Sequence, residues 1–452
     1  MVTLSLSCPL HSSLHTHQNS PNPNTLPLTI SLSKPFHSTQ THSTLSTIQP
    51  HNSSQQHLNS AFQLLQTQPT QEQAHSINTL LQECGQTKNL DIGRKIHEFV
   101  ANSNSFQEDY VINTRLITMY CMCESPLDAR NVFDEIPEKN LYQWNAIISG
   151  YTRNELCFEA LLLFCELIMK TGFKPNNYTF PSVIKACGGI LCLEIGRVVH
   201  GMGLKMGFGE DAYVCNALIA MYGRCGHVEE MVKVFDEMPE RTVVSWNAMV
   251  FGYSECGLVD DSLAVFREML ASDDCLTLDA ASLVTVLPVC AGKGDVEMGK
   301  VVHGLALRLG FHDELTVKNA LVDMYAKCGC ILGAQTLFSN CVNKNVVSWN
   351  VMILGYSREG DVQRAFDLLR QMQVEGVGRI KANAITILNV LSACSDQSKV
   401  RSLKELHGYA FRNGFQNDEL VAGAFVSTYA KCGSLCSADH GFYSMEIMAA
   451  SY

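Results

Sequence analysis

The sequence predicts an all-α fold, a solenoid of stacked helix-turn-helix repeats, from three observations. The only three tryptophans of the 452-residue chain, Trp144, Trp246 and Trp349, stand about 103 residues apart, and other motifs recur at the same interval. Apolar residues recur inside each period with the spacing of a helix face, and no strand-like alternation competes with them. Glycine and proline fall between the helical stretches, where they end one helix before the next begins.

Each period divides into three units of about 35, 31 and 36 residues. In the short unit Ala212–Thr242, apolar residues at helical spacing predict a first helix, and Gly226 ends it. Residues 228–238 predict a second helix, which Pro239 stops. A hairpin of this size cannot bury its apolar face alone, so stacked neighbours must share one continuous core.

The units follow one another without interruption from Ala74 onward. Ten are complete: Ala74–Asp109, Tyr110–Asn140, Leu141–Asn176, Asn177–Asp211, Ala212–Thr242, Val243–Asp279, Ala280–Glu314, Leu315–Asn345, Val346–Asn383 and Ala384–Asp418. An eleventh begins at Glu419 and is cut short near Tyr452. We therefore assign residues 74–452 to the repeat array.

Residues 1–73 have a different composition. No Asp or Glu occurs between Met1 and Gln71, Lys34 is the only basic residue there, and Ser, Thr, His, Gln, Asn and Pro dominate. Such a segment cannot bury a core and is expected to be disordered. Its many hydroxyl residues and missing acids are typical of an organellar transit peptide, and the lack of Arg favours the chloroplast over the mitochondrion. An ordinary disordered tail is the alternative.

The 19 cysteines do not form a disulfide or zinc pattern. No C-x-x-C occurs, and nearly all the cysteines lie inside apolar helical stretches, which indicates small buried side chains in a reducing compartment. No apolar run approaches the roughly 18 residues that span a bilayer, so we expect no membrane association.

Several motifs recur in a fixed cyclic order. The short units contain NALIAMYGRCG from Asn216 and NALVDMYAKCG from Asn319, and the standard units contain VVSWN from Val243 and Val346. The long units contain FPSVIKAC from Phe180, GRVVH from Gly196 and GKVVH from Gly299. These motifs resemble the pentatricopeptide repeat proteins, in particular the plant subclass with alternating long, short and standard repeats. The resemblance implies a right-handed α-α superhelix, and a chain truncated before any extension or deaminase domain.

The resemblance also implies sequence-specific binding of single-stranded RNA in an organelle, one base per repeat, in support of RNA processing, above all C-to-U editing. In this family the fifth and last residues of each repeat select the base. Here these residues are Asn78 with Asp109, Thr114 with Asn140, Asn145 with Asn176, Asn216 with Thr242, Asn247 with Asp279, Asn319 with Asn345, and Asn350 with Asn383. The residues that would stack between bases are Val111, Tyr142, Tyr213, Val244, Thr316 and Val347.

By the same resemblance these pairs predict the target 5′-U-A-Y-N-Y-U-N-Y-Y-3′, where Y is a pyrimidine and N is unread. The unread positions belong to long units, whose fifth residues Pro181, Val284 and Leu388 have no hydrogen-bonding side chain.

No catalytic constellation is recognisable in the repeats. The triplets His227–Glu229 and His312–Glu314 have the H-x-E pattern of a zinc deaminase, but no C-x-x-C follows either of them. We interpret them as solvated turn residues and expect no enzyme activity, metal or cofactor. An editing deaminase would act in trans.

Two alternatives stay open. The formal net charge of −11 counts against a nucleic-acid binder, and it favours a protein-binding scaffold of the tetratricopeptide type. Lys and Arg along the concave face would favour RNA, whereas scattered cations would favour the scaffold. An Asn near a helix start can also be a simple cap. The recurring Trp, Tyr and His residues fit packing or helix-end hydrogen bonds better than stacking or metal binding.

Overall fold

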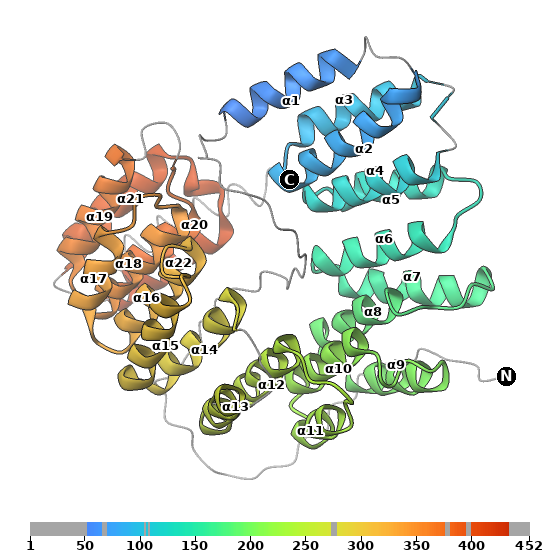
Figure 1. The fold of residues 1–452 in the computed structure, drawn as a ribbon. Helices are drawn as coiled ribbons and strands as arrows, with labels where there is room; N and C mark the ends of the chain where they lie inside the picture. Colours follow the sequence, from blue (N-terminus) through green and yellow to red (C-terminus); the bar gives the residue numbers. More distant parts are fainter. Residues whose placement is uncertain are drawn as a thin grey trace. The chain divides into compact units, whose positions relative to one another are not determined.

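A computed structural model describes residues 52–65, 70–103, 105–106, 109–272, 278–375, 380–394 and 399–433. All of them belong to one compact unit, residues 45–452. Throughout the described ranges the regular structure is helical, as the sequence predicts (Figure 1). None of the described helices is long and apolar enough to cross a membrane.

Each of the ten complete predicted repeats contains two helices, and the eleventh contributes its first helix to the described residues. The first helices begin at or within four residues of the predicted boundaries. The first helices are α2 (Thr70–Thr87), α4 (Tyr110–Met122), α6 (Leu141–Arg153), α8 (Thr179–Gly189), α10 (Ala212–Arg224), α12 (Val243–Glu255), α14 (Ala280–Lys293), α16 (Leu315–Lys327), α18 (Val346–Arg358), α20 (Ala384–Ser392) and α22 (Glu419–Lys431).

The second helices follow after short turns. They are α3 (Leu90–Ala101), α5 (Pro126–Glu135), α7 (Cys157–Lys170), α9 (Leu193–Lys205), α11 (Val228–Asp236), α13 (Val259–Ala271), α15 (Val296–Arg308), α17 (Ile331–Ser339), α19 (Val362–Glu375) and α21 (Val400–Arg412). A short 3₁₀ helix, η2 (Phe415–Asn417), precedes α22.

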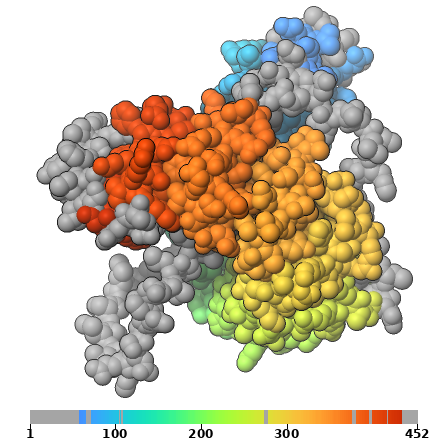
Figure 2. Space-filling model, turned by 90° about the vertical axis from the view of Figure 1, so that its left-hand side faces the viewer, coloured from blue at the N-terminus to red at the C-terminus, as the bar shows by residue number. Residues whose placement is uncertain are grey.

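The helices form two layers. Each first helix contacts the first helix of the next repeat, from α2 through α22, so these helices make one continuous layer. Each second helix packs against its own first helix and against the first helix that follows. The yellow and orange repeats lie side by side in chain order in the space-filling view (Figure 2). This nearest-neighbour packing is the arrangement expected of a solenoid.

One helix differs from the sequence prediction. Helix α1 (Asn52–Leu65) lies within residues 1–73, which we expected to be disordered. Its Leu58 and Leu65 are buried, and its Phe62 ring packs edge-on against Phe99 of α3, with 6.4 Å between centroids. Apolar residues at helical spacing thus give this stretch a face that covers the start of the array. The rest of the predicted transit peptide, residues 1–51, lies outside the described residues.

The recurring aromatic residues are packing contacts. The indole of Trp144 meets Phe133 edge-on at 4.8 Å, and the other two tryptophans repeat this contact on Phe235 and Phe338. Each joins the second helix of a short unit to the first helix of a standard unit. Burial is nearly complete for all three indoles, as predicted for a packing series.

The recurring histidines and tyrosines are partners of one another. The Nδ1 atom of His97 lies 2.8 Å from the Tyr120 hydroxyl. The same pair recurs in His200–Tyr222, His303–Tyr325 and His407–Tyr429, at 2.8, 3.1 and 3.2 Å. Each pair joins the second helix of a long unit to the first helix of the short unit after it, and it satisfies two half-buried polar groups at that junction.

Leu191 occupies a left-handed turn position that Gly294 fills one period later. Its φ is 53°, and its side chain is 65% exposed. The left-handed conformation costs a non-glycine residue about 1–2 kcal/mol, more than the roughly 0.4–1 kcal/mol of extra chain entropy that glycine loses. We expect Leu191→Gly to raise the free energy of unfolding by roughly 0.5–1 kcal/mol in urea denaturation. Leu191→Ala keeps the strained backbone and serves as the control; equal stability of the two variants would contradict the prediction.

Burial lowers the pKa of His200 below its ordinary 6.5, while Glu237 raises it and Lys233 lowers it to smaller extents. The unfolded chain therefore takes up a proton at a higher pH than the folded chain, and stability falls as the pH drops below 6.5. We expect His200→Gln to weaken this acid destabilisation in melting curves recorded from neutral pH to about pH 5. The exposed His75, changed to Gln, is the matched control. An unchanged pH dependence in His200→Gln would show that the buried pair does not contribute.

Candidate nucleic-acid interface

The last residue of most repeats caps the first helix of the next repeat. Its side-chain oxygen accepts a hydrogen bond from a backbone N–H of the first turn, as Oδ1 of Asp109 does from Ile112 at 3.1 Å. The same role falls to Asn140, Asp211, Thr242, Asp279, Asn345, Asn383 and Asp418. Asn176 accepts in the same way from the backbone of Tyr178 and Thr179. The caps are thus last residues of the repeats, whereas the asparagines at the fifth positions, for which capping was the alternative, lie inside the first helices.

Capping fixes which atoms of these side chains are left for a ligand. The cap Asn383 uses its Oδ1 atom as the acceptor, so the side-chain group that capping leaves free is the N–H donor Nδ2. The cap Asp279 uses one carboxylate oxygen and keeps the other as an acceptor. A cap and a base-reading group are thus compatible in one side chain, and the cap holds that group in place.

In three repeats the fifth residue meets the last residue of the same repeat, which also starts the next repeat's first helix. Nδ2 of Asn145 donates to Oδ1 of Asn176 at 3.2 Å, and the same bond joins two other pairs. These are Asn350 with Asn383 at 3.2 Å and Asn319 with Asn345 at 3.5 Å. All three are Asn–Asn pairs, the combination to which the sequence assigned a pyrimidine.

Other predicted pairs are not joined by a hydrogen bond. The hydroxyl of Thr114 donates to the carbonyl of Tyr110 at 2.6 Å, and Nδ2 of Asn78 donates to the carbonyl of Ala74 at 3.0 Å. Both fifth residues are therefore tied to their own helix rather than to Asn140 or Asp109. The Oδ1 atoms of Asn78 and Asn216 are buried without a hydrogen-bond partner among the described residues.

Asn247 is the least accessible of the predicted base-reading residues. It is 1% exposed, and neither its Nδ2 nor its Oδ1 has a partner in the described part of the chain. Helices α10 and α12 approach each other closely: a Cβ atom added to Gly223 would lie only 2.5 Å from the Cα atom of Gly252. Its predicted partner Asp279 bonds instead to its own helix, through Ser282.

The predicted stacking residues differ in exposure. Tyr142 and Tyr213 are well exposed, Val111 and Thr316 are exposed, and Val244 and Val347 are half-buried. The structure adds Tyr178, which is 71% exposed at the second position of a long repeat. Its place in the repeat could have identified it from sequence, but the predicted stacking residues came only from the short and standard repeats. Three consecutive repeats therefore present an exposed tyrosine at this position, and aromatic rings at such sites can stack on bases.

Charge is separated between the two helix layers. The first helices α4, α6, α8, α10, α14, α18 and α20 contain no Asp or Glu. All the second helices except α17 contain at least one. The net charge of −11 therefore does not describe the first-helix layer, where the predicted base-reading residues lie.

Basic side chains recur at the last position of first helices. They are Arg153, Arg224, Lys293, Lys327, Arg358 and Lys431. Lys185 of α8 lies near two of these cations. Its pKa is lowered, first by its partial removal from water and then by the positive charges of Arg224 and Arg153. Three cations from consecutive repeats thus lie near enough for two of them to affect the pKa of the third. Arg153 and Arg224 stand about 12 Å along the helix axis from the fifth position of their repeats, and Lys185 about 6 Å. Sequence reasoning missed this series because it considered net charge rather than repeat position.

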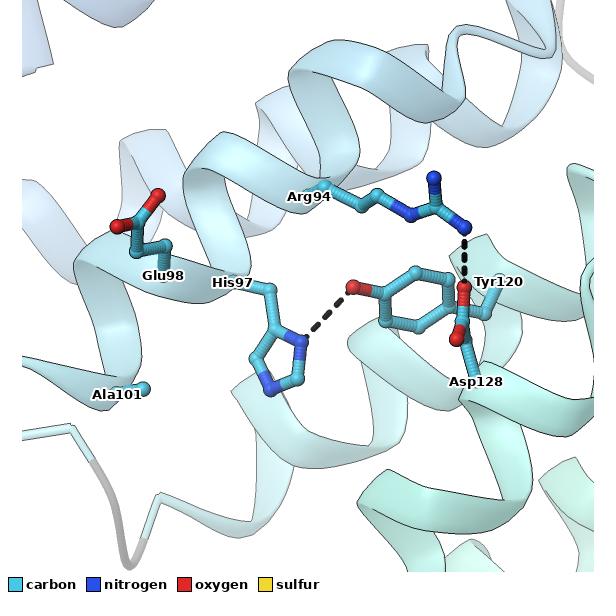
Figure 3. A pocket seen from close by; sticks show the side chains of 6 residues that line it. All are labelled: Arg94, His97, Glu98, Ala101, Tyr120 and Asp128. Atoms are coloured by element: carbon cyan, nitrogen blue, oxygen red, sulfur yellow. Dashed lines mark hydrogen bonds and ion pairs between the residues drawn. The ribbon is translucent and has the colours of Figure 1, made fainter.

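A pocket of about 270 Å³ lies between α3, α4 and α5 (Figure 3). Its polar side chains are paired with one another: Arg94 with Asp128 at 2.9 Å, and His97 with Tyr120. Because the histidine–tyrosine pair recurs in every period, we interpret these residues as a packing junction rather than a reaction centre.

The two H-x-E histidines have local acidic neighbours. His227 lies 3.5 Å from Glu230, and His312 lies 3.1 Å from Asp313. Across the described residues, no group of three side chains gathers that could hold a metal ion. Burial raises the pKa of the Cys187 thiol to about 12. A thiol that stays protonated in this way is an inert packing group rather than a metal ligand or a nucleophile.

Family models match several of the repeats. A model described as the PPR repeat matches residues 114–141, 144–170, 213–243 and 244–273, and one described as the PPR repeat family matches residues 344–396.

Curated relatives come from Arabidopsis thaliana. Pentatricopeptide repeat-containing protein At1g18485 is 47% identical over 372 residues, 82% of this chain and 38% of the relative. At5g39350 is 38% identical over 356 residues, which cover 78% of this chain and 51% of the relative. At3g57430, whose name adds "chloroplastic", is 33% identical over 334 residues, 72% and 37% of the two chains. The chain thus spans about half or less of the length of these relatives.

Among solved structures, the pentatricopeptide repeat protein PPR10 in complex with an 18-nt psaJ RNA element has the same fold. Its TM-score is 0.52 at 18% identity, over 87% of this chain and 62% of that one. The matched repeats, the curated relatives and the shared helical solenoid lead to one conclusion: this chain is a pentatricopeptide repeat protein.

Proposed function

We propose that this protein binds single-stranded RNA sequence-specifically, one base per repeat, and that it serves as a site-recognition factor in organellar C-to-U editing. The observation that carries the proposal is the meeting of the fifth and last carboxamides of one repeat, such as Asn145 with Asn176, in a helix layer where seven of the described first helices contain no Asp or Glu. A carboxamide offers both a donor and an acceptor to a base edge, which is the chemistry of base readout.

Two further features support RNA over a protein scaffold. The tyrosines Tyr142, Tyr178 and Tyr213 give three consecutive repeats an exposed ring beside the base-reading positions. The basic helix ends, including Arg153 and Arg224, supply charge for the phosphate backbone, which dominates the affinity of nucleic-acid binders. The similar protein PPR10 was solved with an RNA element bound.

We further propose that the protein acts in the chloroplast, with the mitochondrion as the alternative, and that an editing deaminase joins it in trans. The composition of residues 1–73 supports an organellar address, and a relative such as At3g57430 carries the word chloroplastic in its name. The repeats belong to the long–short–standard subclass in this proposal, because the recurring motifs follow that cyclic order.

Base readout is tested by changing the preferred base at one position. Asn145→Thr converts the Asn145–Asn176 pair into the Thr–Asn combination that Thr114 and Asn140 already represent. With the full chain and the RNA U-A-Y-N-Y-U-N-Y-Y, we expect preference at the third base to move from a pyrimidine to adenine by about tenfold. Binding to RNA is measured at fixed salt, with scrambled RNA and the matching DNA as controls. Equal or absent binding to all three would favour the scaffold function instead.

The basic helix ends are tested separately. We expect Arg153→Gln and Arg224→Gln each to weaken binding of every RNA sequence alike and to lower the slope of log affinity against log salt by roughly 0.7. Lys233→Gln on the second-helix layer removes an equally positive, exposed charge and is the control. Should this control lower affinity as much as the first-layer variants, backbone binding would not be confined to the first helices.

A further inference from the structure

Two of the base-reading asparagines are held by a threonine from the following repeat. The hydroxyl of Thr179 donates to Oδ1 of Asn145 at 2.7 Å, and the hydroxyl of Thr386 donates to Oδ1 of Asn350 at 2.7 Å. Both threonines are fully buried at the third position of a repeat. A buried group can only orient its neighbour, because no base can reach it.

Backbone groups fix the direction of every hydrogen bond in the first network. The N–H groups of Tyr178 and Thr179 both donate to Asn176 Oδ1 at 3.0 Å, so this atom must be an oxygen. The Asn145 atom that meets it must therefore be the nitrogen. The Asn176 N–H donates to the Thr179 hydroxyl at 3.1 Å, and the hydroxyl lies 2.7 Å from Asn145 Oδ1 and 3.0 Å from Asn176 Oδ1. Because Asn176 Oδ1 already accepts from three N–H groups, the hydroxyl proton is assigned to the nearer Asn145 Oδ1. Turning the Asn145 amide over would break both of its bonds.

The second network repeats these contacts. The N–H of Thr386 donates to Asn383 Oδ1 at 3.0 Å, and the N–H of Asn383 donates to the Thr386 hydroxyl at 3.1 Å. Asn350 Nδ2 then meets Asn383 Oδ1 at 3.2 Å. Two sites about 205 residues apart thus share one arrangement.

Serine at the same position behaves differently. Ser348 donates to its cap Asn345 at 3.1 Å, a contact that Thr179 and Thr386 also make with their caps at 3.0 and 2.9 Å. The difference lies in the fifth residue, because within the described chain Ser348 makes no hydrogen bond to Asn319. Ser282 donates to Asp279 at 2.8 Å, while both side-chain atoms of Asn247 stay without partners. The β-branch of threonine restricts its χ1 angle, whereas a serine hydroxyl is free to turn toward the cap.

We propose that Thr179 and Thr386 are specificity-determining positioning residues, which make their repeats select cytosine over uracil. This inference rests on the proposed RNA-binding function. Oδ1 of the fifth residue is held toward a buried threonine, and Oδ1 of the last residue already accepts the capping N–H groups. The N–H groups of the two amides are therefore the side-chain groups best placed to meet the base. Cytosine offers two adjacent acceptors, N3 and O2, to such a pair. Uracil presents its N3–H donor at the same place, where it meets another donor.

The Asn319–Asn345 repeat gives the opposite expectation. Its inter-amide distance is 3.5 Å, and Asn319 Oδ1 is not held by Ser348. This oxygen can accept the N3–H of uracil, so the repeat accommodates both pyrimidines. The eighth base of the target should therefore be read as either pyrimidine, and the third and ninth bases as cytosine.

The test compares cytosine with uracil at single positions of the RNA, with the full chain and at fixed salt. Wild type should prefer cytosine at the ninth base by roughly fivefold, the worth of one hydrogen bond, and show little preference at the eighth. Thr386→Ser retains the capping hydroxyl and should bring the ninth-base ratio close to one. Ser348→Thr should raise the cytosine preference at the eighth base. Thr285→Ser, at a first-helix threonine bonded only to Ala281 of its own helix, is the matched control.

The outcomes separate the two proposals. If wild type binds no RNA, or shows no base preference at any predicted position, the proposed function fails. If wild type prefers cytosine at the ninth base, but Thr386→Ser keeps that preference and Ser348→Thr gains none at the eighth, the role of the threonines is overturned while RNA binding stands. If Thr386→Ser lowers the melting temperature of the protein, the test rests on Ser348→Thr. A gain of cytosine preference at the eighth base then supports the role of the threonines, and no gain overturns it.

Discussion

Helix capping between consecutive repeats is the interaction on which this architecture depends. A first helix leaves four backbone N–H groups without partners, and the last residue of the preceding repeat supplies an oxygen for them. Because that residue ends one hairpin and starts the next, the cap sets the register of the stack. It also places a polar side chain beside the fifth residue of its own repeat, as Asn176 lies beside Asn145. Fold and recognition therefore share one hydrogen-bond network.

The repeat sequence predicts the fold almost completely, because helix starts, turns and apolar spacing are local properties. Helices α10 and α12 begin at Ala212 and Val243, the residues at which the sequence predicts these repeats to start. The sequence did not predict helix α1, because its apolar face is short and lies in a segment of polar composition. The candidate site was predicted less well. The Asn–Asn pairs meet as their repeat positions suggest, but the burial of Asn247 depends on how closely two helices approach, and no single position in the sequence encodes that distance.

The buried Asn247 carboxamide shows how packing modulates the array. An unpaired buried polar group costs about 1–3 kcal/mol, so this repeat retains a strain that the threonine-held repeats avoid. Gly223 and Gly252 allow the close approach, whereas Cys121 and Ala326 stand opposite the equivalent glycines of the other periods. A base could reach Asn247 only if the helices α10 and α12 moved apart, and its two hydrogen bonds would then offset part of that cost. Repeats with the same predicted code are therefore not equivalent in energy.

Separation of charge explains how an acidic protein can read RNA. Acidic residues gather on the second helices, and some of the cations at the ends of first helices are already paired with acids, as Lys327 is with Asp323 and Arg224 with Glu255. In the proposed complex these cations would neutralise only a few phosphates. The sequence-independent part of the affinity grows with the number of neutralised phosphates, so it stays small in this chain. Binding must then draw on base contacts, whose strength depends on the match between donors and acceptors. On the proposed RNA-binding function, we therefore expect this chain to hold arbitrary RNA weakly and to bind stably only RNA of the matching sequence.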